Sequence, residues 1–332
     1  YVHGANHGQF NTSWGIFDYG YPNNLFLNRK AIIPAAQQEQ VALVYLSAFV
    51  LESIRPGSGY LPLFKDYRSG RHWLPGLVKL NQFHESSASI LCQYDEDLDL
   101  ATGTCGVDSI AASGLALWKE GRIPKKWGDL RNNGVFLGWN NEKDSLPGTY
   151  TIYLDTSNSS SLEGSLALTF LAADAQMDPG ERKEETGGEE EDMEAEGINA
   201  EREEKDKEDA GEVENADKSD ESKESKEKEE SDEPVPLNFS VGLRDSSGVE
   251  YLVNLQDYQY LQPAIKPQII KSRLFWEDNA SEVILQYVYL PLEEFRNSEG
   301  IAVSVKEIAS ISFVFDAEKK GTVIVDQLGF SR

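Results

Sequence analysis

The chain reads IASISFVF at residues 308–315 and GTVIVDQLGF at residues 321–330, two apolar runs separated by a short polar turn. In both runs apolar residues tend to alternate with small or polar ones, which is the period of a β-strand. Similar runs, bounded by Gly, Asn, Asp and Pro, predict further strands at residues 87–92, 134–139, 149–154, 165–170, 237–243, 250–255, 269–276 and 282–290. We therefore expect an all-β sandwich over residues 78–332, with Trp139 in its core.

The C-terminal strands also carry a family resemblance. The order VYLPLEEF at residues 288–295, then IASISFVF, then GTVIVDQLGF is similar to the ending of jelly-roll modules of the galactose-binding and carbohydrate-binding kind. This resemblance implies a jelly-roll fold and carbohydrate as a possible ligand. Tyr258 and Tyr260 lie in an expected loop, and they are the aromatic residues that we expect to stack on a sugar ring.

A second motif lies near the start of the chain, where GANHGQFN occupies residues 4–11. It resembles the histidine loop of secreted α/β-hydrolases such as cutinase-like polyester hydrolases, lipases and dienelactone-hydrolase relatives. Pro34 suits the first turn of a helix, and a broad apolar face follows it as far as Ile54, so we expect a helix at 34–54. The resemblance implies that residues 1–77 are the C-terminal part of an α/β-hydrolase domain and that this is its terminal helix. It implies that His7 is the general base of a serine esterase acting on a small-molecule or polymeric ester. Phe10 and Trp14 would then line the substrate pocket. The alternative is that His7 is only a turn residue.

The serine and the acid of a catalytic triad are not identifiable in this chain. The pattern G-x-S-x-G does not occur, and Gly57-Ser58-Gly59 follows an expected helix instead of a strand. We expect both partners upstream in a longer protein, since only six residues precede His7, and we expect this polypeptide alone to be inactive. The first hypothesis is therefore an esterase fragment with an accessory sandwich. The alternatives are a non-catalytic module that binds carbohydrate or a surface, and a sandwich with a purely structural role.

The charge of the chain is concentrated in one tract. The formal net charge is −26, and residues 178–233 contain 27 acidic and 9 basic residues, a balance of −18. Apolar residues are nearly absent there, so we expect a disordered acidic insertion over residues 176–235, in a loop of the sandwich. Such a charge would repel nucleic acid, which we exclude as a partner. The sequence has no apolar run of 18 residues, so we expect no membrane span.

Two small clusters bear on metals and on redox state. Asp95, Asp97 and Asp99 alternate along the chain, a spacing that suits a structural calcium ion or a plain exposed acidic turn. We expect no other cofactor, because four scattered His and two Cys give no zinc pattern. Cys92 and Cys105 are a candidate disulfide if the protein is secreted. We expect a secreted or cell-surface protein of bacterial type, with a signal peptide upstream of Tyr1.

Overall fold

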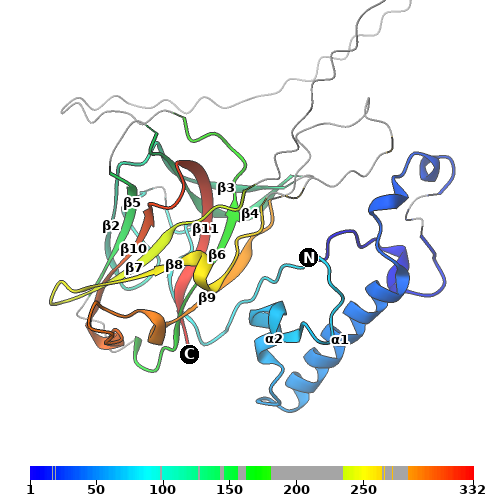
Figure 1. Ribbon diagram of the computed structural model, residues 1–332, viewed down its shortest axis with the longest axis horizontal. Coiled ribbons are helices and arrows are strands. Elements are labelled where there is room, and N and C mark those ends of the chain that lie inside the picture. The colour runs from blue at the N-terminus through cyan, green and yellow to red at the C-terminus, as the bar shows by residue number, and fades with distance from the viewer. Residues whose placement is uncertain are drawn as a thin grey trace, which may run out of the picture. The chain divides into compact units, whose positions relative to one another are not determined.

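The computed structural model describes a sandwich of two antiparallel β-sheets and a mainly helical N-terminal segment, all within one compact unit (Figure 1). The described residues are 1–16, 18, 20–97, 99–125, 128–142, 146–155, 162–180, 235–263, 265, 271 and 283–332. Most of the expected acidic insertion, from 181 to 234, lies outside these residues. The expected strand at 269–276 also lies outside them, apart from Lys271.

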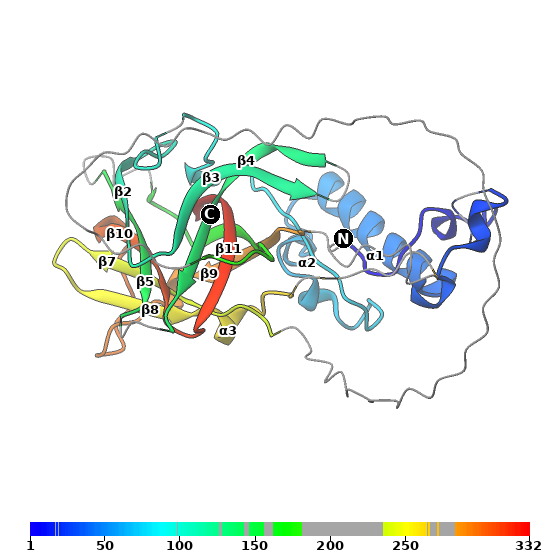
Figure 2. The same cartoon turned by 90° about the horizontal axis from the view of Figure 1, so that it is seen from above.

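The two sheets account for the expected sandwich. The first has the order β3–β4–β11–β6–β9, with β1 also paired to β11, and the second has the order β2–β5–β10–β7–β8. Figure 2 shows β2, β5 and β10 on one side of the sandwich and β3, β4 and β11 on the other. The strands are β1 Ser89–Cys92, β2 Val107–Ser113, β3 Leu117–Lys125, β4 Gly128–Asn140, β5 Gly148–Leu154, β6 Ala167–Asp174, β7 Ser240–Asp245, β8 Glu250–Asn254, β9 Gln286–Pro291, β10 Ile308–Phe315 and β11 Lys320–Ser331. The acidic tract therefore lies between β6 and β7, two strands of the same sandwich.

The main hydrophobic core lies between the sheets and follows the alternation of the strands. Ile311, Phe313 and Phe315 of β10 are fully buried in it. Trp139 of β4, also fully buried, stacks on Phe315 with a ring distance of 4.4 Å and donates its Nε1–H to the Glu318 carbonyl at 2.9 Å. Burial of each such side chain stabilises the fold by about 1.5–3 kcal/mol. The expected β-sandwich is confirmed, with Trp139 in its core.

Two strands were not expected from the sequence. The exposed side of β2 carries Asp, Ala and Ser, and β3 contains Gly121, Pro124 and four charged residues. Neither strand has the run of β-branched or aromatic residues that marks a strand in isolation. Both form because they pair with strong neighbours: β2 with β5, and β3 with β4. Tertiary pairing therefore overrides weak local propensity here.

The N-terminal segment contains α1 at Ala35–Ile54, α2 at Leu61–Lys65 and the 3-10 turn Tyr67–Gly70. The helix expected at 34–54 is thus present. Pro34 occupies its N-cap position, and Glu52 accepts the backbone N–H of Gly57 at 2.7 Å in the turn that ends it. A short helix, α3, at Leu255–Tyr258 follows β8.

The expected remnant of an α/β-hydrolase domain is not supported. In place of a parallel hydrolase sheet, the start of the chain pairs with residues 78–80. Leu80 donates to the Tyr1 carbonyl at 3.0 Å, His3 donates to the Val78 carbonyl at 2.9 Å, and Val2 forms an isolated antiparallel bridge with Lys79. Within the described residues no helix is both long and apolar enough to cross a membrane.

Deleting residues 184–233 is expected to change the thermal unfolding midpoint of the sandwich by less than about 2 °C. The contacts that hold the chain after β6 lie outside the deleted tract: Thr322 Oγ1 donates to the Met177 carbonyl at 3.0 Å, and Lys320 pairs with Asp178 at 2.8 Å. Circular dichroism melts of the full chain and the deletion variant measure the difference. Loss of the cooperative transition in the variant would contradict this expectation.

Candidate functional site

An open pocket lies where the segment between α2 and β1 meets the sandwich, and we call it the polar pocket. The pocket is small: it encloses about 40 Å³, and the space of about 410 Å³ around it includes open solvent. One side is formed by residues 65–68 and 80–81, and the other by residues 259, 260, 262, 286 and 287. Residues nearly two hundred positions apart therefore meet here.

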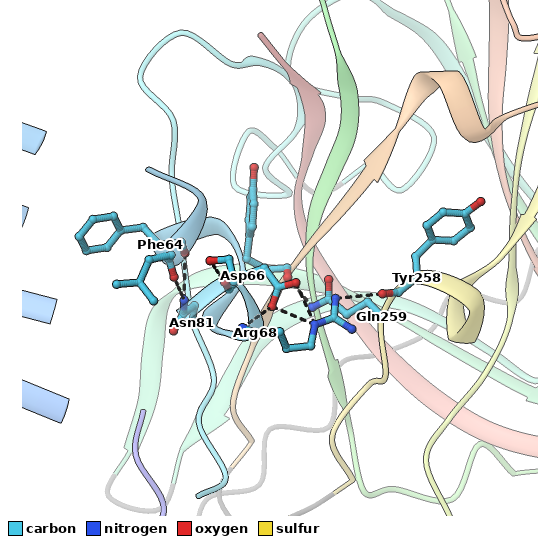
Figure 3. A network of polar contacts seen from close by, with 9 residues as sticks. Phe64, Asp66, Arg68, Asn81, Tyr258 and Gln259 are labelled. Carbon is cyan, nitrogen blue, oxygen red and sulfur yellow. Dashed lines mark hydrogen bonds and ion pairs between the residues drawn. The ribbon is translucent and has the colours of Figure 1, made fainter. Parts of the chain in front are cut away.

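Arg68 joins the two sides of the polar pocket. Its Nε donates to both carboxylate oxygens of Asp66, at 2.9 and 2.8 Å, and its Nη2 donates to the backbone carbonyl of Tyr258 at 2.9 Å (Figure 3). Asp66 also accepts the backbone N–H of Arg68 at 2.9 Å, which starts the 3-10 turn. We call this ion pair the Arg68–Asp66 clamp. Both of its side chains stay partly exposed, so its polar atoms are accessible from the pocket.

Amide side chains fix the backbone around the pocket. Gln286, buried at the start of β9, accepts the backbone N–H of Gln262 at 3.1 Å, and Gln259 donates to the Tyr287 carbonyl at 2.6 Å. Across the pocket, Asn81 donates to the carbonyls of Leu63 and Phe64, at 2.7 and 3.2 Å (Figure 3). These bonds hold the backbone on both sides of the pocket in place without a ligand.

The two tyrosines expected to stack on a sugar differ in placement. Tyr260 lines the polar pocket, and half of its surface (50%) is exposed. Tyr258 instead packs against the sandwich core, and its hydroxyl donates to Glu294 Oε2 at 3.0 Å. Burial, and then the hydrogen bond to Glu294, raises the pKa of Tyr258. Of these two tyrosines, only Tyr260 lines the pocket, together with Tyr67 and Tyr287.

The charges of the polar pocket are paired. Lys65 forms an ion pair with Glu85 at 3.2 Å, and both side chains are only 15% exposed. The Lys65 ammonium also lies 5.0 Å from the centre of the Tyr289 ring, an additional favourable contact. Arg68 is paired with Asp66 in the same way. The pocket thus combines hydrogen-bonding groups with no excess charge of either sign.

The His7 loop is well ordered but does not meet a catalytic partner. Buried Gln38 of α1 accepts the Asn6 N–H at 3.1 Å and donates to the Ile33 carbonyl at 3.1 Å, while Asp18 accepts the backbone N–H of His7 at 2.9 Å. The exposed His7 ring contacts the edge of the Trp14 ring, at 5.2 Å between ring centres. No serine or carboxylate among the described residues is hydrogen-bonded to this ring.

The expected substrate-pocket residues of the hydrolase do not form a pocket. Phe10 and Trp14 are 43% and 64% exposed, and neither lines a cavity described in this structure. Trp14 lies in the turn after the 3-10 helix Gly8–Phe10, where Asn11 accepts its backbone N–H at 3.0 Å. The His7 loop therefore brings together two of the expected groups, His7 and Trp14, as a surface pair.

The three aspartates proposed to bind calcium are engaged in loop hydrogen bonds. Asp95 accepts the backbone N–H of Asn133 at 2.7 Å, Asp97 accepts that of Asp99 at 2.8 Å, and Asp99 accepts that of Ala101 at 2.9 Å. No group of three or more His, Cys, Asp or Glu side chains in the described part of the chain is placed to hold a metal ion. The calcium hypothesis therefore has no support from this geometry.

Cys92 and Cys105 are both free thiols, which corrects the expected disulfide. Their segments are neighbours, because the backbone N–H of Cys105 donates to the Leu91 carbonyl at 3.2 Å. The side chains diverge, however: Cys92 is fully buried in the core, whereas Cys105 is exposed. Burial raises the pKa of the Cys92 thiol to about 12, which keeps it protonated and unreactive.

A buried carboxyl group, Asp326, was not expected from the sequence. It lies on β11 and is only 1% exposed, and its oxygens accept the Asn132 amide and the backbone N–H of Gln327, both at 2.7 Å. Burial, and the nearby carboxylate of Asp95, raise its pKa to about 7. Glu120 of β3 has its pKa raised to about 7 in a similar way, by burial and then by Glu96 and neighbouring aspartates.

The polar side chains that line the pocket were also not predicted from the sequence. Their signal is weak: glutamine recurs at every third position in LQDYQYLQ, residues 255–262, which otherwise reads as an ordinary polar loop. Asp66 and Arg68 lie about 190 positions away from this loop. Only the fold brings the two segments together.

No family model matches this sequence, and no curated protein is similar to it. Among solved structures, the family 11 carbohydrate-binding module of the cellulosomal cellulase Lic26A-Cel5E of Clostridium thermocellum is 10% identical, with a TM-score of 0.33 over 73% of this chain and 93% of the module. An exo-β-agarase is 11% identical, with a TM-score of 0.36 over 73% of this chain and 25% of the agarase. The agarase AgWH50C is 8% identical, with a TM-score of 0.32 over 74% of this chain and 24% of that one. Similarity this low does not transfer a function, which has to be argued from the residues of this chain.

Replacing Asp326 with Asn is expected to stabilise the protein at pH 8 by about 2–4 kcal/mol, with the gain fading towards pH 4. A folded pKa of about 7, raised from 3.8, means that the folded state loses stability as pH rises from about 4 to 7, because ionisation is disfavoured in the core. Denaturant titrations at both pH values measure this effect.

The matched control is Asp245→Asn, because hydrogen bonds from Ser247 hold the pKa of Asp245 below its usual value. That variant should lose stability at pH 8. A stability difference for Asp326→Asn that is independent of pH would contradict the assignment.

We expect the chain to hydrolyse p-nitrophenyl butyrate no faster than buffer alone, because no nucleophile in the described part of the chain is hydrogen-bonded to His7. Nitrophenolate release, followed by absorbance, measures this rate, with His7→Ala as the matched control. A rate above buffer that disappears in His7→Ala would restore the esterase hypothesis.

Proposed function

We propose that this protein is a non-catalytic carbohydrate-binding module whose ligand binds in the polar pocket. The observation that carries the proposal is the half-exposed Tyr260 ring beside amides and paired charges, in a pocket that Tyr67, Leu80 and Tyr287 also line. A pyranose has apolar C–H faces and a rim of hydroxyl groups. It therefore needs an aromatic surface and hydrogen-bonding groups side by side, which tyrosine and planar polar side chains supply.

The hydrogen-bonding groups suit vicinal hydroxyls. Gln259 and Gln262 each carry a donor and an acceptor on one planar amide, and the Arg68 guanidinium presents a fork of N–H groups next to the Asp66 carboxylate. Two adjacent hydroxyls can each donate to one such group and accept from another. Because Arg68 and Asp66 hold each other in place, little side-chain freedom is lost when a ligand binds.

A neutral sugar fits this pocket better than a charged one. Each cation, Lys65 and Arg68, already has a carboxylate partner. An acidic sugar would have to compete with Glu85 or Asp66 for that cation, and separating a partly buried ion pair is costly. The proposed ligand class is therefore a neutral oligosaccharide or polysaccharide.

The same pairing favours binding over catalysis. Glycoside hydrolysis requires two carboxyl groups that flank the scissile bond, one acting as acid and the other as base or nucleophile. Asp66 is the only carboxylate among the residues that line the pocket, and it is held by Arg68. We infer a binding role in preference to glycoside or ester hydrolysis, with the protein acting outside the cell, where such polysaccharides occur.

We expect a neutral soluble glucan to retard the protein in affinity gel electrophoresis, and a polyuronate such as alginate not to do so. The first probe is β-1,3-1,4-glucan, because a family 11 module among the similar structures was solved with a β-1,3-1,4-mixed-linked tetrasaccharide. Tyr260→Ala is expected to weaken binding by about tenfold or more, as truncation of a central aromatic contact does.

Two control variants make the test specific. Tyr258→Phe keeps the packing of Tyr258 and removes only its hydroxyl, so it should bind normally. Tyr153→Ala, on the outer face of β5, removes a ring that is 45% exposed but lies outside the pocket. Binding that is lost in Tyr153→Ala and kept in Tyr260→Ala would contradict the pocket assignment, and no binding to any neutral glucan would contradict the function.

A further inference from the structure

Helix α1 is apolar on two opposite faces. Val41 and Ala48 are buried in the small core of the N-terminal segment. On the other side Leu43, Leu46, Val50 and Ile54 are 67%, 64%, 49% and 71% exposed, and we call these four residues the apolar stripe. Phe49 and Leu51, 60% and 39% exposed, flank it. A helix that is apolar all round is normally covered on all sides.

The spacing of the apolar stripe is that of a helix–helix contact. Its members follow one another at intervals of 3, 4 and 4 residues, so at 100° per residue they form one continuous row along about three turns. Side chains in such a row interdigitate with the same row on a second helix. The stripe contains no charged residue, so its composition also matches the centre of an interface.

The exposed apolar surface of α1 is large enough to form one side of a small interface. The stripe and its two flanking residues leave roughly 600 Å² of side-chain surface in water, at the upper end of patches on monomeric proteins and near the ~800 Å² per partner of a standard interface. Within the described residues, thirteen of the large exposed apolar side chains belong to positions 1–73, and only nine belong to the longer sandwich. The exposed apolar surface is thus concentrated on this segment.

Charge argues against a membrane or the acidic tract as the occupant. Helix α1 carries Glu39 and Glu52 and no Lys or Arg, whereas helices that lie on membranes are rich in basic residues. The tract at residues 178–233 has almost no apolar side chains to cover the stripe. A second copy of this chain provides an apolar row from its own α1 and, in Arg55 directly after that helix, a cation to pair with Glu39.

We propose that α1 pairs with α1 of a second copy of this chain, antiparallel, about a two-fold axis at the level of Ala48. In this register Leu46 faces Val50 of the second copy, and Leu43 faces Ile54. Glu39 lies within about one turn of Arg55 of the second copy. Both charged side chains are exposed, and the structure gives neither of them an ion-pair partner among the described residues. Because the contact is isologous, each of these pairs occurs twice.

Sedimentation equilibrium of the full chain tests the proposal. We expect a dimer that dissociates on dilution, and Leu46→Asp should be monomeric at concentrations up to roughly 100 μM. The matched control is Ile301→Asp, which places the same charge at an exposed apolar position (56%) of the sandwich and should remain dimeric. Circular dichroism verifies that both variants are folded. A wild-type monomer over this range, open-ended aggregation, or a dimer unaffected by Leu46→Asp would overturn the proposal.

A charge exchange tests the antiparallel register separately. Glu39→Arg and Arg55→Glu should each raise the dimer dissociation constant, by roughly tenfold, because each places like charges opposite one another twice. The double variant Glu39→Arg/Arg55→Glu should restore the wild-type constant. Failure of the double variant to recover would overturn the paired register, even if Leu46→Asp is monomeric.

Discussion

The contact of Lys65 with the sandwich is the constraint on which the polar pocket depends. Its ammonium lies 5.8 and 5.0 Å from the centres of the Phe83 and Tyr289 rings and 3.2 Å from Glu85, so the last residue of α2 is fastened to β9. Each ring contact contributes about 0.5–2 kcal/mol. Residues 66–68 directly follow Lys65 in the chain. The contacts of Lys65 therefore place Asp66 and Arg68 beside the loop that carries Tyr260. The pocket therefore depends on a tertiary contact that the sandwich itself does not need.

The two parts of the chain differ in how their cores are built. The sandwich buries a continuous layer of aromatic and branched side chains between its sheets, centred on Phe313 and Trp139. Among its described residues, the N-terminal segment has four buried core side chains, Val41, Ala48, Leu63 and Leu74, with partly buried apolar side chains packed against them. A core of four residues provides little stability. The segment gains stability from its contact with the sandwich. This contact does not cover the apolar stripe, which stays available for the proposed contact with a second copy.

The sequence predicts the parts of this structure that follow from periodicity. The alternation in β10 and β11 and the apolar face of α1 were sufficient to locate these three elements. The pocket could not be predicted, because Asp66, Arg68 and Gln259 are ordinary surface residues until the fold brings them together. The disulfide failed for a related reason: spacing placed Cys92 and Cys105 close in the chain, but strand pairing turned one thiol into the core. The histidine loop is ordered as its motif suggests, yet order alone does not make His7 catalytic.

A crystal structure of the full chain with a neutral β-1,3-1,4-gluco-oligosaccharide tests the central claim most directly. The account predicts a sugar ring stacked on Tyr260, with hydroxyl groups bonded to the Arg68–Asp66 clamp and to Gln259 or Gln262. A sugar bound instead on the outer face of β5 and β10, beside Tyr153, would contradict the assigned site. An unchanged, empty pocket at saturating oligosaccharide would contradict carbohydrate binding at this site.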